Sequence, residues 1–252
     1  MKIQYCSDLH LEFPENKSFM ERNPLKVEGE ILLLAGDIIP FALLDKPNNF
    51  FDFVSDKFSA VYWIPGNHEY YHYDLARKSS PLNEKIRKNV FLVNNTEVEH
   101  KGVKLIFSTL WSKISPGNTW KIQNSISDFF LIKMNHKLFT PFDFSNLHEE
   151  SFAFLKTAVK KNKSDKTLIV THHIPTLMNY PAMYKGDSLN EAFAVELFDF
   201  IEKAGADYWL YGHHHANIPE FTVGKTKLIT NQLGYVRQNE HRTFKNDAIV
   251  EV

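Results

Sequence analysis

The sequence predicts a layered α/β protein, and three observations support this. Short runs of β-branched and other apolar residues recur along the chain, each bounded by glycine, proline or polar residues, as is typical of strands. Longer segments between several of these runs have apolar residues at helical spacing. Five of the apolar runs lead directly into aspartate, asparagine or histidine, at the position where sheets of this class bind ligands.

Eight of the apolar runs are predicted to be strands. Several lack the alternation of a half-exposed strand, so we expect them to be buried on both faces. In chain order the predicted strands are 2–6, 30–36, 60–66, 103–109, 166–172, 206–212, 227–232 and 247–252. Helices are predicted at 48–59, 146–161 and 190–205, and the last of these closes on Gly205, a residue type that commonly ends helices.

A long segment at about residues 111–144 has no regular period and is rich in polar and aromatic residues. We expect it to cross one face of the domain as an excursion that forms a partial lid. No internal repeat or Gly/Ser-rich linker divides the chain, and 252 residues suffice for one large core. We therefore predict a single domain over residues 1–252.

The composition is that of a soluble globular protein, with 43% hydrophobic and 23% charged residues. A formal net charge of -1 gives no electrostatic reason to expect tight binding to nucleic acid or to an anionic membrane. The single cysteine, Cys6, excludes an internal disulfide framework and fits a reducing compartment. The apolar run before Asp8 is too short for a signal peptide, and no long uncharged apolar stretch follows. We expect a cytoplasmic protein with no membrane association and no obligate protein partner.

Three consecutive histidines follow the strand predicted at 206–212. Such a run could be a surface tag, a cluster satisfied by hydrogen bonds, or a set that includes metal ligands. On an extended segment alternate residues face the same side, which would pair His213 with His215 and leave His214 apart. Two histidines alone make a weak metal site, so the third interpretation requires oxygen ligands from elsewhere in the chain.

Such ligands follow the other predicted strands, whose ends carry the motifs SDLH, GD, GNHE and THH. Each motif alone has an ordinary explanation as a turn, a helix cap or a histidine bonded to backbone. Because neighbouring strand ends converge in open α/β sheets, together they predict one site. Its candidate ligands are Asp8, His10, Asp37, Asn67, His172, His213 and His215. These exceed the four ligands of a tetrahedral zinc site, and a carboxylate that bridges two ions is the arrangement of two-metal hydrolases.

The ordered set D-x-H, GD, GNHE, H and GHxH, which spans Asp8 to His215, resembles that of the calcineurin-like metallophosphoesterases. The resemblance implies a four-layer α/β/β/α sandwich in which helices flank two central mixed sheets. It also implies that His68 stands beside the substrate as a general acid. The implied dinuclear centre has one metal held by Asp8, His10, Asp37 and His215 and the other held by Asp37, Asn67, His172 and His213, so that Asp37 bridges the ions.

Two neighbouring histidines compete for one ligand position. Only one of His172 and His173 can face the centre from a strand, and the family pattern favours His172, which leaves His173 for the phosphate or an outer contact. The sequence departs from the Ser/Thr protein phosphatases of the superfamily, whose GDxxDRG and RGNHE are here GDIIPFA and PGNHEYY, so the arginine that those enzymes use at the phosphate is missing. The stretches ISDFFLIK, GDSLNEAFAVEL and NQLGYV are similar to a bacterial branch of the superfamily.

The predicted chemistry is hydrolysis of a small phosphoester, either a diester or a monoester. Ligands of mixed nitrogen and oxygen type accept divalent ions such as manganese, iron or zinc, and two ions are expected. A hydroxide generated between the ions would attack phosphorus while His68 protonates the leaving oxygen. Two other functions remain open. A metal-dependent nuclease would normally show a basic, aromatic-lined track, and a non-catalytic scaffold is disfavoured by the intact ligand set and the intact His68.

Overall fold

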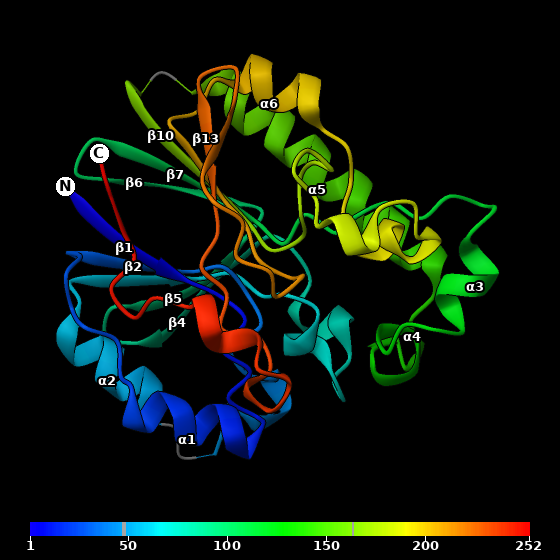
Figure 1. Cartoon of the computed structure of the whole chain (residues 1–252), viewed down its shortest axis with the longest axis horizontal. Coiled ribbons are helices and arrows are strands. Elements are labelled where there is room, and N and C mark those ends of the chain that lie inside the picture. Colours follow the sequence, from blue (N-terminus) through cyan, green and yellow to red (C-terminus); the bar gives the residue numbers. More distant parts are fainter. Residues whose placement is uncertain (47–48, 163) are drawn as a thin grey trace.

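Two six-stranded mixed sheets pack face to face, and helices cover the outer face of each sheet (Figure 1). The computed structural model describes residues 1–46, 49–162 and 164–252. Helices α1 (Pro14–Arg22) and α2 (Asn49–Lys57) lie outside the first sheet, and α5 (Pro141–Lys161) and α6 (Phe198–Ala204) lie outside the second. The architecture is the layered α/β fold that the sequence pattern predicts and, more closely, the four-layer α/β/β/α sandwich that the family resemblance implies, and both predictions are confirmed.

The first sheet has the strand order β14-β1-β2-β3-β5-β4, with four parallel strands at its centre and an antiparallel strand at each edge. Its strands are β1 (Lys2–Cys6), β2 (Ile31–Leu34), β3 (Ala60–Trp63), β4 (Leu82–Arg87), β5 (Val90–Asn94) and β14 (Ile249–Glu251). Side chains alternate between the two faces of a strand, so Leu32 and Leu34 pack on the helix side while Ile31 and Leu33 pack against the second sheet. Both faces are covered, which is why the run is apolar throughout.

The second sheet has the order β12-β13-β11-β10-β7-β6, again with four parallel central strands and antiparallel edges. Its strands are β6 (Thr96–His100), β7 (Val103–Ser108), β10 (Lys166–Thr171), β11 (Tyr208–Leu210), β12 (Phe221–Val223) and β13 (Thr226–Ile229). Its outer face packs on α5 and α6 through a cluster that contains Leu155, Ile201 and Trp209.

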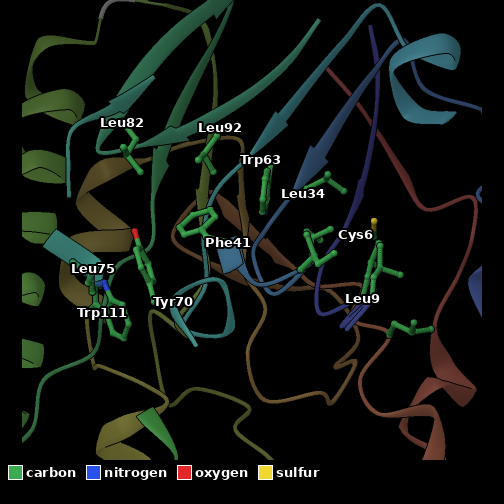
Figure 2. Close-up of a cluster of buried hydrophobic side chains, with 14 of the residues drawn as sticks. Cys6, Leu9, Leu34, Phe41, Trp63, Tyr70, Leu75, Leu82, Leu92 and Trp111 are labelled. Atoms are coloured by element: carbon green, nitrogen blue, oxygen red, sulfur yellow. The ribbon is translucent and has the colours of Figure 1, made fainter. Parts of the chain in front are cut away.

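Figure 2 shows the core on the helix side of the first sheet, where Leu34, Trp63 and Leu92 project from neighbouring strands toward Phe41 and Tyr70. The Phe41 ring contacts both Trp63 and Tyr70, with centroids 5.8 Å and 5.1 Å away. Full burial of a large apolar side chain contributes roughly 1.5–3 kcal/mol. This packing holds the loop between Trp63 and Tyr70, which contains the GNHE motif, against the end of the sheet.

All eight predicted strands form, although most end earlier than predicted. The sequence did not predict β4, β5, β6, β12 or helix α1. Strands β4 and β6 each pair in a hairpin with the strand that follows, and their sequences LNEKIR and TEVEH are too charged to resemble a buried run.

All three helix predictions need correction in their bounds. The helix predicted at 146–161 begins at Pro141, because Thr140 and Asp143 form a capping box at its start. The helix predicted at 48–59 corresponds to α2. The first residue of that prediction, Asn48, lies outside the described residues.

The helix predicted at 190–205 is wrong in its first half. Helix α6 begins only at Phe198, because the backbone of the preceding residues pairs with the loop after β10 instead. The Ile174 N–H donates to the Phe193 carbonyl, and the Val195 N–H donates to the Ile174 carbonyl. These bonds hold residues 193–195 against that loop in spite of their helical spacing, and the residues before them form only a short 3₁₀ helix (Ser188–Ala192).

The excursion at residues 111–144 contains short regular elements. These are α3 (Thr119–Gln123), α4 (Asp128–Leu131), β8 (Lys133–Met134), β9 (Lys137–Leu138) and the first turn of α5. Figure 1 shows α3 and α4 at one end of the molecule, away from α1 and α2. Trp111, Phe139 and Phe144 are buried and anchor the segment. In the described ranges, no helix has both the length and the apolar character needed to cross a membrane.

Candidate metal centre

The candidate ligands lie beyond the carboxyl ends of parallel strands from both sheets. Strands β1, β2 and β3 of the first sheet, and β10 and β11 of the second, each end one to four residues before a candidate ligand. The two sets of loops meet: the His213 N–H donates to Asp8 at 3.0 Å, although Asp8 follows a strand of the other sheet. The sequence predicted this convergence of strand ends, and the structure brings all seven candidate ligands together.

The backbone at five of the seven candidate ligands has a positive φ, which is uncommon for residues other than glycine. These residues are Asp8 (55°), His10 (47°), Asp37 (56°), His213 (86°) and His215 (53°). The expectation that His213 and His215 face one side of an extended segment is therefore wrong, because this segment is a tight turn. A non-glycine residue in this region costs roughly 1–3 kcal/mol, and such strain concentrates at functional sites.

One group of ligand atoms comes from Asp8, His10 and His215, whose nearest polar atoms all lie within 4.8 Å of one another. The Nε2 atoms of His10 and His215 are 2.9 Å apart, and His215 Nε2 lies 3.5 Å from Asp8 Oδ1. Asp8 and His10 are fully buried. These three residues are the ones that the family resemblance assigned to the first metal together with Asp37.

A second group comes from Asp37, His172 and His213, again within 4.8 Å. His172 Nε2 is the common neighbour: it lies 3.1 Å from His213 Nδ1, 3.2 Å from Asn67 Oδ1 and 3.4 Å from Asp37 Oδ2. Asp37 Oδ2 also lies 3.8 Å from His10 Nε2 of the first group. A single carboxylate oxygen thus stands between the two groups.

Each of the four imidazoles directs one ring nitrogen away from the centre to an oxygen acceptor. The pairs are His10 Nδ1 with Glu12 (3.2 Å), His215 Nδ1 with Glu240 (2.7 Å), His172 Nδ1 with the Ala35 carbonyl (2.8 Å) and His213 Nε2 with the Ala192 carbonyl (3.3 Å). Carboxylate and carbonyl oxygens only accept, so these nitrogens carry a hydrogen, and the opposite nitrogen of each ring faces the centre, where it can give its lone pair to a metal ion that displaces any proton there. Metal-binding histidines adopt this arrangement, and the donor set fits divalent ions.

The charge of the centre also favours the binding of cations. Burial alone would lower the pKa of His172 and His215, but Asp37 beside the first and Asp8 beside the second raise them to about 9 and about 10. Both carboxylates are buried, and the histidines around them hold the pKa of each below its usual range against the effect of burial. The centre therefore attracts positive charge, which protons or metal ions can supply.

The model of the calcineurin-like phosphoesterase family matches residues 1–217. The chain belongs to that family. It is also 33% identical, over 279 aligned residues, to "Uncharacterized protein L509" of Acanthamoeba polyphaga mimivirus. The alignment covers 99% of this chain and 96% of that protein. Its fold is similar to that of the phosphopantetheinyl hydrolase from Mycobacterium tuberculosis, with a TM-score of 0.72 and 18% identity over 96% of this chain and 92% of the other.

His68 of this phosphoesterase lies beside the two groups with its ring nitrogens bonded elsewhere. Nδ1 bonds Glu12 Oε1 at 3.0 Å, and Nε2 lies 3.2 Å from the Tyr235 hydroxyl. The ring stacks on Tyr71 with centroids 4.0 Å apart. Burial opposes protonation of His68, but the charges of Asp37 and Glu12 outweigh it and raise its pKa.

Glu12 was missed by the sequence analysis, although it stands two residues after His10. Its Oε1 accepts hydrogen bonds from both His10 and His68. Burial opposes ionisation of Glu12, yet these two bonds hold its pKa at about 2. Glu12, His10 and His68 also form a third cluster of possible ligands, but the nitrogens that face Glu12 already carry hydrogens and are satisfied.

Asn67 is held by a residue of the excursion. Its Nδ2 donates to Asp128 Oδ1 at 2.8 Å, which turns Oδ1 toward His172. The Tyr71 hydroxyl donates to the same Asp128 oxygen at 2.9 Å. Asp128 is 1% exposed and nothing in its local sequence distinguishes it from a surface aspartate, so the sequence alone did not identify it.

Glu69, the last residue of the GNHE motif, links the loop that carries Asp37 to its own loop by hydrogen bonds. It accepts the backbone N–H groups of Asp37 (2.8 Å), Ile38 (2.6 Å) and Gly66 (2.6 Å), and the Trp63 indole N–H at 3.1 Å. Burial and the neighbouring Asp37 charge raise the pKa of Glu69 to about 8, whereas the donated N–H groups favour its ionised form. Its role is to fix the loop geometry.

A cavity of about 370 Å³ opens onto the centre. Residues 125–128 of the excursion line it, so this part of the predicted lid lies at the site, while its closure stays a prediction. Five aromatic side chains also line the cavity: Tyr71, Tyr180, Tyr184, Phe193 and Tyr235. Within the described ranges its lining includes no lysine or arginine, but it includes Asp187 and Glu240.

His173 and His214, which neighbour candidate ligands but have no predicted ligand role, are both buried. His214 does not point away from the site, since it lines the cavity, and its Nδ1 accepts from Gln232 Nε2 at 2.9 Å. Burial lowers the pKa of His214 to about 4, so its ring is neutral. His173 packs on Trp111, and among the described residues neither of its ring nitrogens has a hydrogen-bond partner. Burial holds its pKa well below the usual range.

Proposed function

We propose that this family member is a metal-dependent phosphodiesterase that hydrolyses small phosphodiesters, with His68 as the general acid. The observation that carries the proposal is the position of Asp37 Oδ2, between two groups of inward-facing nitrogen and oxygen ligands. One ion would be held by Asp8, His10, Asp37 and His215 and the other by Asp37, Asn67, His172 and His213. Manganese, iron or zinc suits this mixed set.

Two ions, when bound, neutralise the phosphate and lower the pKa of a water molecule to about 7. The protein residues do the remaining work. Asp128 orients the Asn67 amide, and Glu69 holds the loops that carry Asp37 and Asn67. His68 delivers a proton to the leaving oxygen, because its Nε2 faces Tyr235, which lines the cavity, whereas its Nδ1 is bonded to Glu12.

The lining of the cavity favours a diester over a monoester. A monoester carries a second negative charge near neutral pH, which the bound ions would have to neutralise without help from cationic side chains. Asp187 and Glu240 would instead oppose that charge, and the cavity has no lysine or arginine in the described ranges. The aromatic side chains suit an apolar or aromatic group on the second ester oxygen. The same shortage of basic residues argues against a nuclease.

The test is a substrate panel with protein stripped of metal and reloaded with manganese, iron or zinc. The panel contains bis(para-nitrophenyl) phosphate, para-nitrophenyl phosphate, alkyl diesters and a phosphopantetheinyl ester, the last because the mycobacterial neighbour is named a phosphopantetheinyl hydrolase. We expect kcat/KM for diesters to exceed that for monoesters by about tenfold or more, a difference of about 1.4 kcal/mol. His68→Ala should lower activity, and His136→Ala is the matched control because that side chain is 95% exposed. Absence of hydrolysis with every metal, or a preference for monoesters, would contradict the proposal.

A further inference from the structure

One carboxylate oxygen serves two histidines that have different tasks in the proposed function. Glu12 Oε1 accepts from His10 Nδ1 at 3.2 Å and from His68 Nδ1 at 3.0 Å. The Glu12 side chain is 13% exposed and lies in the turn between β1 and α1. The ring centroids of the two histidines are 4.4 Å apart in an edge-to-face arrangement, so a shift of Glu12 would move both rings.

The bonds determine which nitrogen of each ring is available. An ionised carboxylate can only accept, so both Nδ1 atoms carry a hydrogen. Nε2 of His10 is then a lone pair directed at His215, as a metal ligand requires. Nε2 of His68 faces the Tyr235 hydroxyl at 3.2 Å, on the side of the cavity.

We propose that Glu12 is the positioning residue of the general acid: it aligns a hydrogen-bonded chain, Glu12–His68–Tyr235, with Nε2 of His68 aimed at the leaving oxygen. The inference rests on the proposed function and adds a residue that belongs neither to the sequence motifs nor to the two proposed metal sites. During the reaction the oxygen of a hydroxide ion, formed from water that has already lost a proton to solvent, bonds to phosphorus, and the bond from phosphorus to the leaving oxygen breaks with its electron pair on that oxygen. The proton of His68 Nε2 moves to that oxygen, while Glu12 keeps its charge and gains no proton.

Glu240 provides the matched control. Its Oε2 accepts from His215 Nδ1 at 2.7 Å, which is the same carboxylate–imidazole bond on a candidate metal ligand. Glu240 makes no hydrogen bond to His68 within the described ranges, although it also accepts the backbone N–H of Tyr235. Glutamine at this position keeps an acceptor for both bonds. Glu240→Gln therefore tests support of a metal ligand alone, and Glu12→Gln and Glu12→Ala test support of both histidines.

The experiment compares these variants with His68→Ala and with the double variant Glu12→Ala/His68→Ala, at saturating manganese and with metal content measured. For a diester with an alkyl leaving group, we expect Glu12→Ala to lower kcat about 10- to 100-fold with KM nearly unchanged. The loss should be smaller for a nitrophenyl leaving group, which needs little protonation. Glu12→Gln should recover most of the activity. In the His68→Ala background, removal of Glu12 should cost nothing further in kcat. Glu240→Gln should change both substrates by the same factor, and excess metal should reduce that loss.

A second measurement does not depend on activity. The ¹⁵N shifts of the His68 ring, recorded on the zinc-loaded protein and assigned with His68→Ala, report which nitrogen carries the hydrogen. At a pH where the His68 ring is neutral we expect the hydrogen on Nδ1 in the wild type and loss of that preference in Glu12→Ala, whereas the acid form that donates the Nε2 proton carries hydrogen on both nitrogens. An additive loss in the double variant, equal losses on both leaving groups, or an unchanged tautomer in Glu12→Ala would overturn the assignment. A wild type that shows the Nδ1 tautomer but hydrolyses no phosphoester would refute the proposed function and leave only the hydrogen-bond geometry standing.

Discussion

Asn67 and His68 are neighbours in the chain, and the proposed mechanism gives them separate tasks that two substitutions can distinguish. Asn67 Oδ1 lies 3.2 Å from His172 Nε2, whereas both ring nitrogens of His68 are bonded outside the two metal groups. Asn67→Ala removes a ligand atom, so we expect weaker metal binding and an activity loss that excess metal partly restores. His68→Ala should keep both ions.

The size of the His68→Ala effect follows from what the side chain contacts. Loss of a placed general acid lowers turnover by on the order of 10² to 10⁴. The variant also loses the stacking on Tyr71, worth about 0.5–1.5 kcal/mol, and leaves Glu12 with one donor fewer, at a cost of about 1–3 kcal/mol. We therefore expect a measurable fall in thermal stability together with a much larger fall in kcat.

The assay is kcat for a series of diesters whose leaving groups differ in pKa, with metal content measured on the same samples. A nitrophenyl leaving group needs little protonation and an alkyl group needs a great deal, so the defect of His68→Ala should grow with leaving-group pKa. The general-acid assignment would be refuted if His68→Ala lost a metal, or lost the same factor on every substrate.

Three further outcomes are expected. Asp128→Ala should weaken metal binding about 10- to 100-fold, as titration of the apoprotein with manganese can show, because the ligand amide it orients loses its partner. Gly66→Ala places a Cβ 2.2 Å from a ligand carboxylate and should displace it and lower stability by about 1–3 kcal/mol, whereas Gly117→Ala, with open space around its Cβ, should be nearly neutral in urea unfolding. Metal-free protein should lose stability in urea unfolding as pH rises from about 7 to 10. The pKa values of His172 and His215 are raised to about 9 and about 10, so the protonated rings stabilise the fold fully only below the pKa of an unfolded histidine, and this stabilisation is lost as the rings deprotonate. Constant stability over that range would contradict the assignment of charge.

The sequence predicted the parts of the fold that depend on local pattern. Fully buried parallel strands such as 31–34 appear as continuous apolar runs, because both faces are covered. Edge hairpins such as β4–β5 carry charged residues on an exposed face, and a search for apolar runs passes over them. The helix predicted at 190–205 is wrong in its first half for a tertiary reason, since residues 193–195 pair with Ile174 and the residues before them form only a short 3₁₀ helix.

The candidate ligands were accessible to sequence analysis because chemistry at the end of a strand is a local feature. The residues that hydrogen-bond to these ligands or to their loops were not identified, and they fall into two classes. Glu12 and Glu69 each lie within two residues of a predicted site residue, and a search for hydrogen-bond partners near each histidine would have raised them as candidates. Asp128, Tyr235 and Glu240 come from segments whose distance to the centre is decided by the fold as a whole.

The strained backbone explains why the right residues were predicted for a wrong reason. Alternation on an extended strand was expected to pair His213 with His215, yet both have positive φ and belong to opposite metal groups. A turn can direct successive side chains in directions that a strand cannot, so His213 reaches His172 while His215 reaches His10. Positive φ costs free energy that the apoprotein must offset with other contacts, among them the bond from the His213 N–H to Asp8. Metal binding repays that cost in the folded state only, and we therefore expect the largest gain in stability on metal binding to come from ordering these turns.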